Sequence, residues 1–299
     1  MGAFQEKTPA RARESQAVNQ ADLTRLVALA AIWGASFLFN RIAAPALGPV
    51  LTAELRTLIA GLALAAWFAF SGFDPQWRRW WPQYIIVGVL SSAVPFLLWA
   101  YAALSLPAGL LSVLNATSPM WGALCSAFLL GERLHGKRII GLALGFFGVA
   151  LVTQPTDDEA LYLPAVIGAL AAAFCYGLAA AHMKRWAGDV PSRGMAVGTQ
   201  LVAGTLLIPF IPLWPPTAAP TPLVAASMLA LGLVCGSIAY LLYFRLIADI
   251  GATGALTVTY LIPVFGVLWG ALFLGETVTL LMLAGATLVV MGTVFVLKN

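Results

Sequence analysis

The sequence is poor in charge. Only 9% of its 299 residues are Asp, Glu, Lys or Arg, whereas 61% are hydrophobic. A soluble domain has about 25% charged residues and about half apolar residues, so this chain cannot build a water-exposed surface around a core. The net charge of +4 does not indicate a nucleic-acid partner, because basic residues between hydrophobic segments set the orientation of a membrane protein. We therefore predict an integral membrane protein that contacts the lipid bilayer and no nucleic acid.

The sequence also lacks the residue patterns of an enzyme or metal site. It has two histidines, and Cys125, Cys175 and Cys235 each lie in an apolar run without paired spacing. This pattern indicates buried free thiols, with neither a disulfide framework nor a zinc site. No glycine-rich loop with its lysine is present for nucleotide phosphates, so ATP is not expected as the direct energy source. We expect no catalytic residue, no metal and no cofactor.

What the sequence does contain is one pattern written twice. In each copy a proline is followed by a Gly-Glu pair, and the two copies match in both directions from this segment. The matched region covers about half of each copy and contains no gap. The matched positions, each separated by 144 residues, include Pro119 and Pro263, Gly131 and Gly275, Glu132 and Glu276, Gly88 and Gly232, and Gly141 and Gly285. Self-similarity at one long period indicates a duplicated unit.

Hydrophobic segments of about 20 residues, the length that crosses a bilayer, occur repeatedly. They predict helices, because a helix satisfies its own backbone in lipid and no strands of alternating polarity are visible. The ten expected helices span 24–43, 50–71, 83–104, 107–130, 137–154, 160–182, 193–213, 221–247, 251–274 and 277–297. The predicted fold class is all-α integral membrane, with two five-helix repeats, 23–156 and 157–299, in one membrane domain. Residues 1–22 lack a signal-peptide pattern and are expected to form a disordered cytoplasmic tail.

The distribution of basic residues predicts the orientation. All Lys and Arg residues other than Arg41 and Arg56 fall in segments that become cytoplasmic when the N-terminus is placed inside. Cytoplasmic loops carry this excess of positive charge in membrane proteins. We therefore predict that both termini are cytoplasmic.

The repeat and the orientation together predict inversion. One repeat contains five helices, an odd number, so the two copies must cross the membrane in opposite directions. Inverted repeats occur in many secondary transporters, with the substrate site near the midplane where the halves meet. Exchanging the conformations of the two halves would turn an outward-open cavity into an inward-open one. A duplication without transport is the alternative, and the inverted arrangement favours a transporter.

Several short motifs occur along the chain. They are Trp33-Gly34 with Asn40, Pro49 with Arg56, Tyr101-Ala102-Ala103-Leu104, and the duplicated segments from Pro119 to Glu132 and from Pro263 to Glu276. In their order and spacing these motifs resemble the ten-helix EamA-type exporters of the drug/metabolite transporter superfamily. The resemblance covers nearly the whole chain, and the aromatic content is similar to that of the aromatic amino-acid exporters in this superfamily. It implies export across a bacterial inner (plasma) membrane, and we expect a monomer or a weak homodimer.

Aromatic residues in register predict the walls of a cavity. Trp99 in the third helix aligns with Tyr243 in the eighth at an offset of 144, and Tyr240 and Ser92 lie on the corresponding faces. Such side chains would suit flat, amphipathic or cationic solutes through stacking and cation–π contacts. Core packing is the alternative interpretation.

The resemblance adds further residues to this set. It implies roles in substrate binding for Trp33, Asn40 and Tyr101. Tyr176 occupies the position of Trp33 at an offset of 143, whereas Asn40 has no counterpart in the second repeat. Whether both halves contact the substrate equally is therefore left open by the sequence.

Helices four and nine carry matching stripes of small and polar residues. In the fourth helix, Asn115 is expected at the cavity wall, with Pro119 and Gly122 as hinge or packing positions, because a proline within a helix removes a backbone hydrogen bond and bends it. The corresponding positions of the ninth helix are Thr259 for substrate binding, and Pro263, Gly266 and Gly270 for hinge or packing. Small residues on one face also allow close helix packing in lipid, which is the alternative role. We expect these two helices to contact each other.

Two charged residues lie within the second predicted helix. Charge inside a membrane is costly and often functional. Arg56 is a candidate for holding a substrate carboxylate, with contact to helix-end carbonyls as the alternative. Glu54 is a candidate for proton coupling. Two residues apart on one helix, the pair face nearly opposite sides and are not expected to bond to each other.

These features favour a secondary transporter that exports small amphipathic organic solutes, such as aromatic amino acids, by alternating access around a central cavity. Helices five and ten, poor in polar residues, would form an outer scaffold. One alternative is a phosphorylated-metabolite or nucleotide-sugar carrier of the same superfamily, which would need several cationic groups in the cavity. The other is a membrane-embedded lipid-modifying enzyme. Aromatic cavity walls would favour the exporter of amphipathic solutes, and clustered Lys and Arg would favour the phosphorylated-metabolite or nucleotide-sugar carrier.

Overall fold

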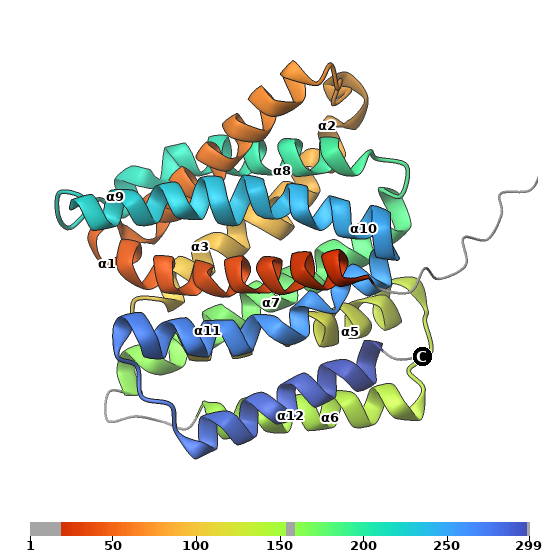
Figure 1. Cartoon of the computed structure of the whole chain (residues 1–299), viewed down its shortest axis with the longest axis vertical. Coiled ribbons are helices and arrows are strands. Elements are labelled where there is room, and N and C mark those ends of the chain that lie inside the picture. The colour runs from red at the N-terminus through yellow and green to blue at the C-terminus, as the bar shows by residue number, and fades with distance from the viewer. Residues whose placement is uncertain (1–18, 154–158, 298–299) are drawn as a thin grey trace, which may run out of the picture.

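The computed structural model of the chain describes residues 19–153 and 159–297, and every regular element among them is a helix. Figure 1 shows the long helices stacked side by side, from α2 and α8 at one end of the molecule to α6 and α12 at the other. Eight helical segments within the described residues are long and apolar enough to cross a membrane. The predicted all-α membrane fold is therefore confirmed.

The helices of the first half are α1 Gln20–Phe70, α2 Trp77–Gly88, η1 Val89–Ala93, α3 Val94–Ala102, α4 Ala108–Asn115, α5 Ser118–Leu130 and α6 Gly136–Val152. Those of the second half are α7 Glu159–Trp186, α8 Ser192–Leu207, η2 Ile208–Leu213, α9 Pro222–Leu229, η3 Ala230–Ile238, α10 Ala239–Leu256, α11 Val258–Leu274 and α12 Leu280–Leu297. Here η1 and η3 are π-helical, and η2 is a 3₁₀-helix.

The first two predicted spans are joined in α1, which has 51 residues. Gly48, with φ 76° and ψ 159°, interrupts the helix between the expected spans, and Pro49 follows it. A residue before proline is displaced from the helical region, and glycine adopts a positive φ at little cost. The expected fifth span corresponds to α6, which has only 17 residues and is not one of the eight segments long enough to cross a membrane. The count of ten spans therefore stays a prediction.

The start of α1 lies earlier than the sequence predicted. Asn19 accepts a hydrogen bond from the backbone N–H of Asp22 at 2.9 Å, and Asp22 accepts one from the N–H of Asn19 at 3.4 Å. This reciprocal cap starts the helix at Gln20. Residues 20–22, assigned to the tail from the sequence, therefore belong to α1, and residues 1–18 of that tail lie outside the described residues.

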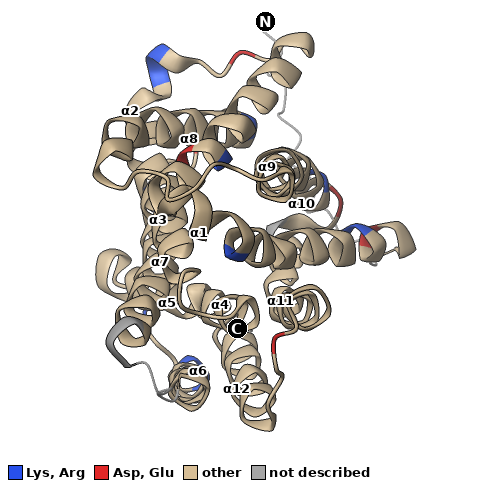
Figure 2. Ribbon diagram, turned by 90° about the vertical axis from the view of Figure 1, so that its left-hand side faces the viewer, with Lys and Arg blue, Asp and Glu red and all other residues tan. Residues whose placement is uncertain are grey.

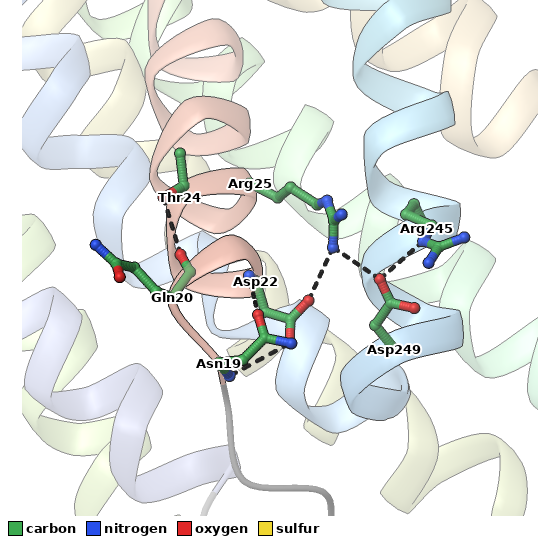
Figure 3. A network of polar contacts seen from close by, with 7 residues as sticks. All are labelled: Asn19, Gln20, Asp22, Thr24, Arg25, Arg245 and Asp249. Carbon is green, nitrogen blue, oxygen red and sulfur yellow. Dashed lines mark hydrogen bonds and ion pairs between the residues drawn. The ribbon is translucent and has the colours of Figure 1, made fainter.

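A polar network holds this end of α1 against α10 (Figure 3). Arg25 donates to Asp22 at 3.0 Å and to Asp249 at 2.9 Å, and Arg245 donates to the same Asp249 carboxylate at 2.8 Å. The first helix of one repeat is thus tied to the third long segment of the other repeat, at the end predicted to be cytoplasmic.

Irregular backbone recurs at matching places in the two halves. The π-helix η1 at 89–93 has its counterpart, 144 residues later, within η3. The helix ends also match, because Gly131 (φ 70°, ψ 20°) and Gly275 (φ 66°, ψ 23°) adopt the same left-handed cap. Equal local conformations at this offset support the duplication on structural grounds.

Contacts between the halves are related by a twofold axis. On α6 and α12, a Cβ added to Gly141 would lie 2.7 Å from the carbonyl oxygen of Gly292, and one added to Gly148 would lie 2.7 Å from that of Gly285. Because Gly141 corresponds to Gly285 and Gly148 to Gly292, each contact is the image of the other. The register also runs in opposite directions along the two helices. The two repeats are therefore inverted relative to each other, as a twofold interface requires.

The paired helices α6 and α12 form one end of the molecule in both views (Figures 1 and 2), as expected of a scaffold. Figure 2 looks nearly along the helices and shows few Lys, Arg, Asp and Glu among them. The largest group of buried apolar side chains comes mainly from α1, α3, α4, α7, α10 and α11, with smaller contributions from α6, α8 and α12.

Candidate functional site

A cavity of about 600 Å³ lies between the two repeats. Its lining comes mainly from α1, α3, α5, α7, α10 and α11, with one or two residues from each of η1, α4, α6, α8, η3 and α12. It extends from Arg56, which is buried, to the exposed side chain of Lys184, beside Glu132 and Arg138. The cavity therefore reaches the surface at the end of the molecule where α5 and α7 terminate.

The walls of the cavity are aromatic. The rings of Trp33 and Tyr243 lie 5.4 Å apart, and Phe37 meets Trp99 edge to face, also at 5.4 Å. The aromatic lining residues are Trp33, Phe37, Phe96, Trp99, Tyr176, Tyr240 and Tyr243. The first and third helices of one repeat and their counterparts in the other supply this set, so both halves contribute to the same surface.

Arg56 is the cation deep in this cavity. It is 7% exposed, and its guanidinium carbon lies 3.9 Å above the centre of the Phe96 ring. Its Nε has no hydrogen-bond partner, and no described carboxylate forms an ion pair with it. A buried charge is normally paired, so this side chain is free to bind an anionic group of a solute.

Gln200 of α8 is a cavity residue that the sequence analysis missed. It is 1% exposed, and its amide nitrogen lies 3.4 Å from both the Ser92 and the Tyr240 hydroxyl oxygens. Within the described residues, its amide oxygen has no hydrogen-bond partner. A signal was available, because Gln200 is a polar residue inside an apolar span, but the sequence analysis assigned no role to any residue of the predicted helix 193–213.

The structure brings most of the predicted substrate-binding residues together. Those that line the cavity are Trp33, Arg56, Trp99, Asn115, Tyr176, Tyr240, Tyr243 and Thr259. Three others do not line it. The Asn40 amide donates to the Ser36 carbonyl oxygen at 2.8 Å, Ser92 lies behind Gln200, and Tyr101 packs edge to face on Trp214 at 5.9 Å.

Glu54, the predicted proton-coupling residue, also lies away from the cavity lining. It is 4% exposed, and among the described residues no ion pair reaches it. As expected from their spacing, Glu54 and Arg56 do not bond to each other.

The predicted hinge positions differ between the two repeats. In the fourth helix, α4 ends at Asn115 and α5 starts at Ser118, so the break precedes Pro119 by a few residues, and both Pro119 and Gly122 line the cavity. Pro263 instead lies inside the continuous helix α11, whose break falls at Thr257. The two prolines therefore do not mark equivalent hinges, because the backbone group freed by Pro263 does not interrupt its helix.

The contact expected between helices four and nine is confirmed. A side chain on Gly266 would collide with Ser112 of α4, and one on Gly270 would lie 3.4 Å from the backbone nitrogen of Gly109. The Ser112 hydroxyl also lies 3.5 Å from the carbonyl oxygen of Pro263. Both glycines are therefore packing positions.

The two Gly-Glu pairs have different partners at the two ends of the cavity. At the accessible end, Glu132 accepts from Lys184 at 2.5 Å and pairs with Arg138 at 3.6 Å. The hydrogen bond from Lys184 lowers the pKa of the Glu132 carboxyl, and the charges of Lys184 and Arg138 add to this effect. Here the carboxylate is held by side chains.

At the opposite end, Glu276 caps a helix. Its two oxygens accept the backbone N–H groups of Ala108 at 2.7 Å and Gly109 at 3.1 Å, at the start of α4. Arg41 lies 3.9 Å from the same carboxylate and donates to the carbonyl oxygen of Ala103 at 2.8 Å. These bonds join α1, the α3–α4 connection and the end of α11 at this end of the molecule.

Comparisons with known proteins agree with this architecture. The model of the EamA-like transporter family matches residues 23–154 and again 163–298. The transporter YvbV of Bacillus subtilis, described as uncharacterized, is 28% identical over 89% of this chain and 88% of its own. A probable amino-acid metabolite efflux pump of Escherichia coli is 27% identical over 87% and 89%.

Two further matches extend the comparison. A probable terminal-alkyne amino-acid exporter of Streptantibioticus cattleyicolor is 26% identical over 91% of both chains. A solved crystal structure superimposes with a TM-score of 0.64 at 20% identity, covering 92% of this chain and 96% of the other. That structural likeness shows the fold, whereas the family match identifies the two halves as copies of one unit.

Proposed function

The chain belongs to the EamA-like transporter family, and from this premise we propose that it exports amphipathic metabolites, in particular aromatic amino acids and related compounds, by alternating access. The family consists of transporters, so the lipid-modifying enzyme considered above is set aside. The observation that carries the proposal is a cavity walled by aromatic rings, with one unpaired arginine at its buried end.

The substrate class follows from the chemistry of this lining. Flat rings would stack against Trp33, Tyr243 and Trp99, and a cationic amine would be attracted to the faces of such rings. Arg56 would bind the carboxylate, because a guanidinium offers several donors to it. The amide oxygen of Gln200 would accept from the amine. The cavity thus offers an apolar surface together with donors and an acceptor, as an amino acid with a large side chain requires.

The names of two relatives agree with this substrate class. One is a probable amino-acid metabolite efflux pump, and the other a probable terminal-alkyne amino-acid exporter. A phosphorylated-metabolite carrier fits less well. The other lining cations, Lys184 and Arg138, lie at the mouth and are paired with Glu132, so Arg56 alone would face a phosphate.

Alternating access is supported by the asymmetry of two inverted repeats around one cavity. The cavity reaches the surface where Lys184 is exposed, whereas at the opposite end Glu276 and Arg41 bond to the connection between α3 and α4. With the N-terminus inside, as the basic residues predict, the Lys184 end is the cytoplasmic end of a bacterial inner-membrane protein, and the described conformation would receive solutes from the cytoplasm. The orientation of the chain and its location in a bacterial inner membrane are both parts of the proposal.

The coupling to an energy source is a separate part of the proposal. Glu54 is a buried acid in the second arm of α1, but it lies away from the cavity. Facilitated diffusion or exchange therefore competes with proton coupling. If coupling exists, Glu54→Gln should abolish the effect of a pH gradient on flux and leave exchange without a gradient intact.

The deciding experiment is flux of labelled tryptophan and phenylalanine in proteoliposomes, with and without a pH gradient. We expect saturable, protein-dependent flux of at least one of the two, and competition by other aromatic amino acids. Liposomes that contain Arg56→Ala protein serve as the matched control. Absence of flux for both solutes, with correctly inserted protein, would end the substrate assignment.

A further inference from the structure

Glu276 and Glu132 hold equivalent positions but are bonded differently, and this difference suggests what closes each end of the cavity. Each residue follows a left-handed glycine cap at the end of its helix. Each also lies beside a cation from the first helix of the other repeat. Arg41 pairs with Glu276, and Lys184, which aligns with Arg41 at an offset of 143, pairs with Glu132.

Of these two glutamates, Glu276 alone caps a helix within the described residues. Its partners, the N–H groups of Ala108 and Gly109, start α4 immediately after the extended residue Pro107. The equivalent positions, 252 and 253, follow Gly251, which has an extended ψ of 166° and likewise separates two helical arms. A carboxylate is stabilised at a helix start by the unpaired N–H groups and the helix dipole. The second repeat therefore contains a matching helix start whose N–H groups could donate to Glu132.

We propose that Glu132 and Glu276 act as alternating latches, each closing its own end of the cavity by capping the helix start that faces it. The proposal rests on alternating access as the proposed function. In the described conformation the Glu276 latch is closed, and Glu132 is held by Lys184 and Arg138. In the opposite conformation Glu276 releases Ala108 and Gly109, and Glu132 caps the turn after Gly251.

Two local differences make the latches unequal. A side chain at Gly270 would collide with the Glu276 carboxylate, and the equivalent position in the first repeat is Ser126, which does have a side chain. Arg138, which competes for Glu132, has Met282 as its counterpart. Both differences weaken the Glu132 latch, so the transporter at rest is open at the Glu132 end.

The test measures from which side the cavity is open. A single reporter, Ser118→Cys, is placed on the cavity wall of the full chain after the native Cys125, Cys175 and Cys235 are replaced by alanine. A membrane-impermeant maleimide is then added from either face of proteoliposomes without any solute. The ratio of the two labelling rates reports the population of the two conformations.

Glu276→Gln is expected to shift this ratio about tenfold toward labelling from the Glu276 end, because hydrogen bonds to a charged acceptor are lost. Gly270→Ser, which places a side chain against the carboxylate, should shift it in the same direction. If either fails to fold, the other carries the test. Thermal stability in detergent identifies a folding defect separately from a shift in conformation.

Ser126→Gly and Arg138→Met make the first repeat resemble the second and should also increase labelling from the Glu276 end, by strengthening the Glu132 latch. Adding Glu132→Gln to Ser126→Gly should cancel that increase. An unchanged ratio in folded Glu276→Gln protein would overturn the latch. An unchanged labelling ratio in the Ser126→Gly and Arg138→Met proteins would overturn the claim that the Glu132 latch is the weaker of the two. Because labelling needs no solute, a wrong substrate assignment leaves these results interpretable.

Discussion

Among individual residues, Arg56 has the most unusual environment. A guanidinium so deeply buried is normally paired with a carboxylate, yet its neighbour is the Phe96 ring at 3.9 Å. The ring stabilises the charge partly through a cation–π contact and leaves donor groups unused. The residue is therefore poised to bind an anionic group that enters the cavity.

The residue-scale prediction concerns this donor. In Arg56→Gln protein, tryptophan should inhibit the flux of labelled phenylalanine about 10- to 100-fold more weakly, because a charge-assisted hydrogen bond contributes about 1.5–3 kcal/mol. Inhibition by tryptamine, which lacks the carboxylate, should change little. Competition assays in proteoliposomes measure both. Arg79→Gln is the matched control, since Arg79 also stacks on a ring, Trp80 at 4.5 Å, but does not line the cavity. Equal losses for both inhibitors would refute the carboxylate role.

At the scale of helices, close glycine contacts position the elements around the cavity. Besides the α6–α12 contact, Gly34 of α1 packs on Gly266 of α11, and its counterpart Gly177 of α7 packs on Gly122 of α5. Small residues let helix backbones approach in lipid, where no hydrophobic effect drives them together. The same contact thus recurs at both sides of the twofold axis.

The element-scale prediction addresses the α6–α12 pair. Gly148→Val should destabilise the protein by about 1–3 kcal/mol, as overpacking does, because its Cβ would meet the carbonyl oxygen of Gly285 at 2.7 Å. Gly136→Ala, at the start of α6 with open space around it, should leave stability unchanged or raise it slightly. Thermal unfolding in detergent, followed by tryptophan fluorescence, compares the two. A Gly148→Val protein as stable as Gly136→Ala would contradict this packing.

For the whole molecule, inversion of the repeats is the property on which the proposed alternating access depends. The twofold-related contacts of α6 with α12 place equivalent helices antiparallel. Equivalent ends of the two halves therefore lie on opposite sides of the molecule. The side on which each lies in a cell is predicted by the basic residues alone.

The whole-molecule prediction tests that orientation. Single cysteines are introduced at His135, in the connection after Glu132, and at Thr279, in the connection after Glu276. In intact cells an impermeant maleimide should react with Thr279→Cys only, and in inside-out vesicles with His135→Cys only. Reaction of both from one face would contradict the inverted repeats. Reaction with the sides exchanged would reverse the predicted orientation and, with it, the direction of the open cavity.

Several features of this protein were determined by the sequence itself. The scarcity of charge requires a membrane environment, and the offset of 144 residues reveals the duplication, because hydrophobic length and repetition are local properties of a chain. Arg56 and the aromatic residues Trp99, Tyr240 and Tyr243 were predicted as cavity residues for the same reason, since a polar or aromatic residue stands out within an apolar span.

Only the tertiary structure decided which of these side chains share a space. Asn40 and Tyr101 match family motifs, yet one bonds within its own helix and the other packs on Trp214. Gln200 enters the cavity, and Glu276 caps a helix 168 residues away in the chain. Equivalent sequence positions acquire different partners because a transporter in one conformation is not symmetric. That asymmetry arises from packing across the twofold axis and is not encoded in either repeat alone.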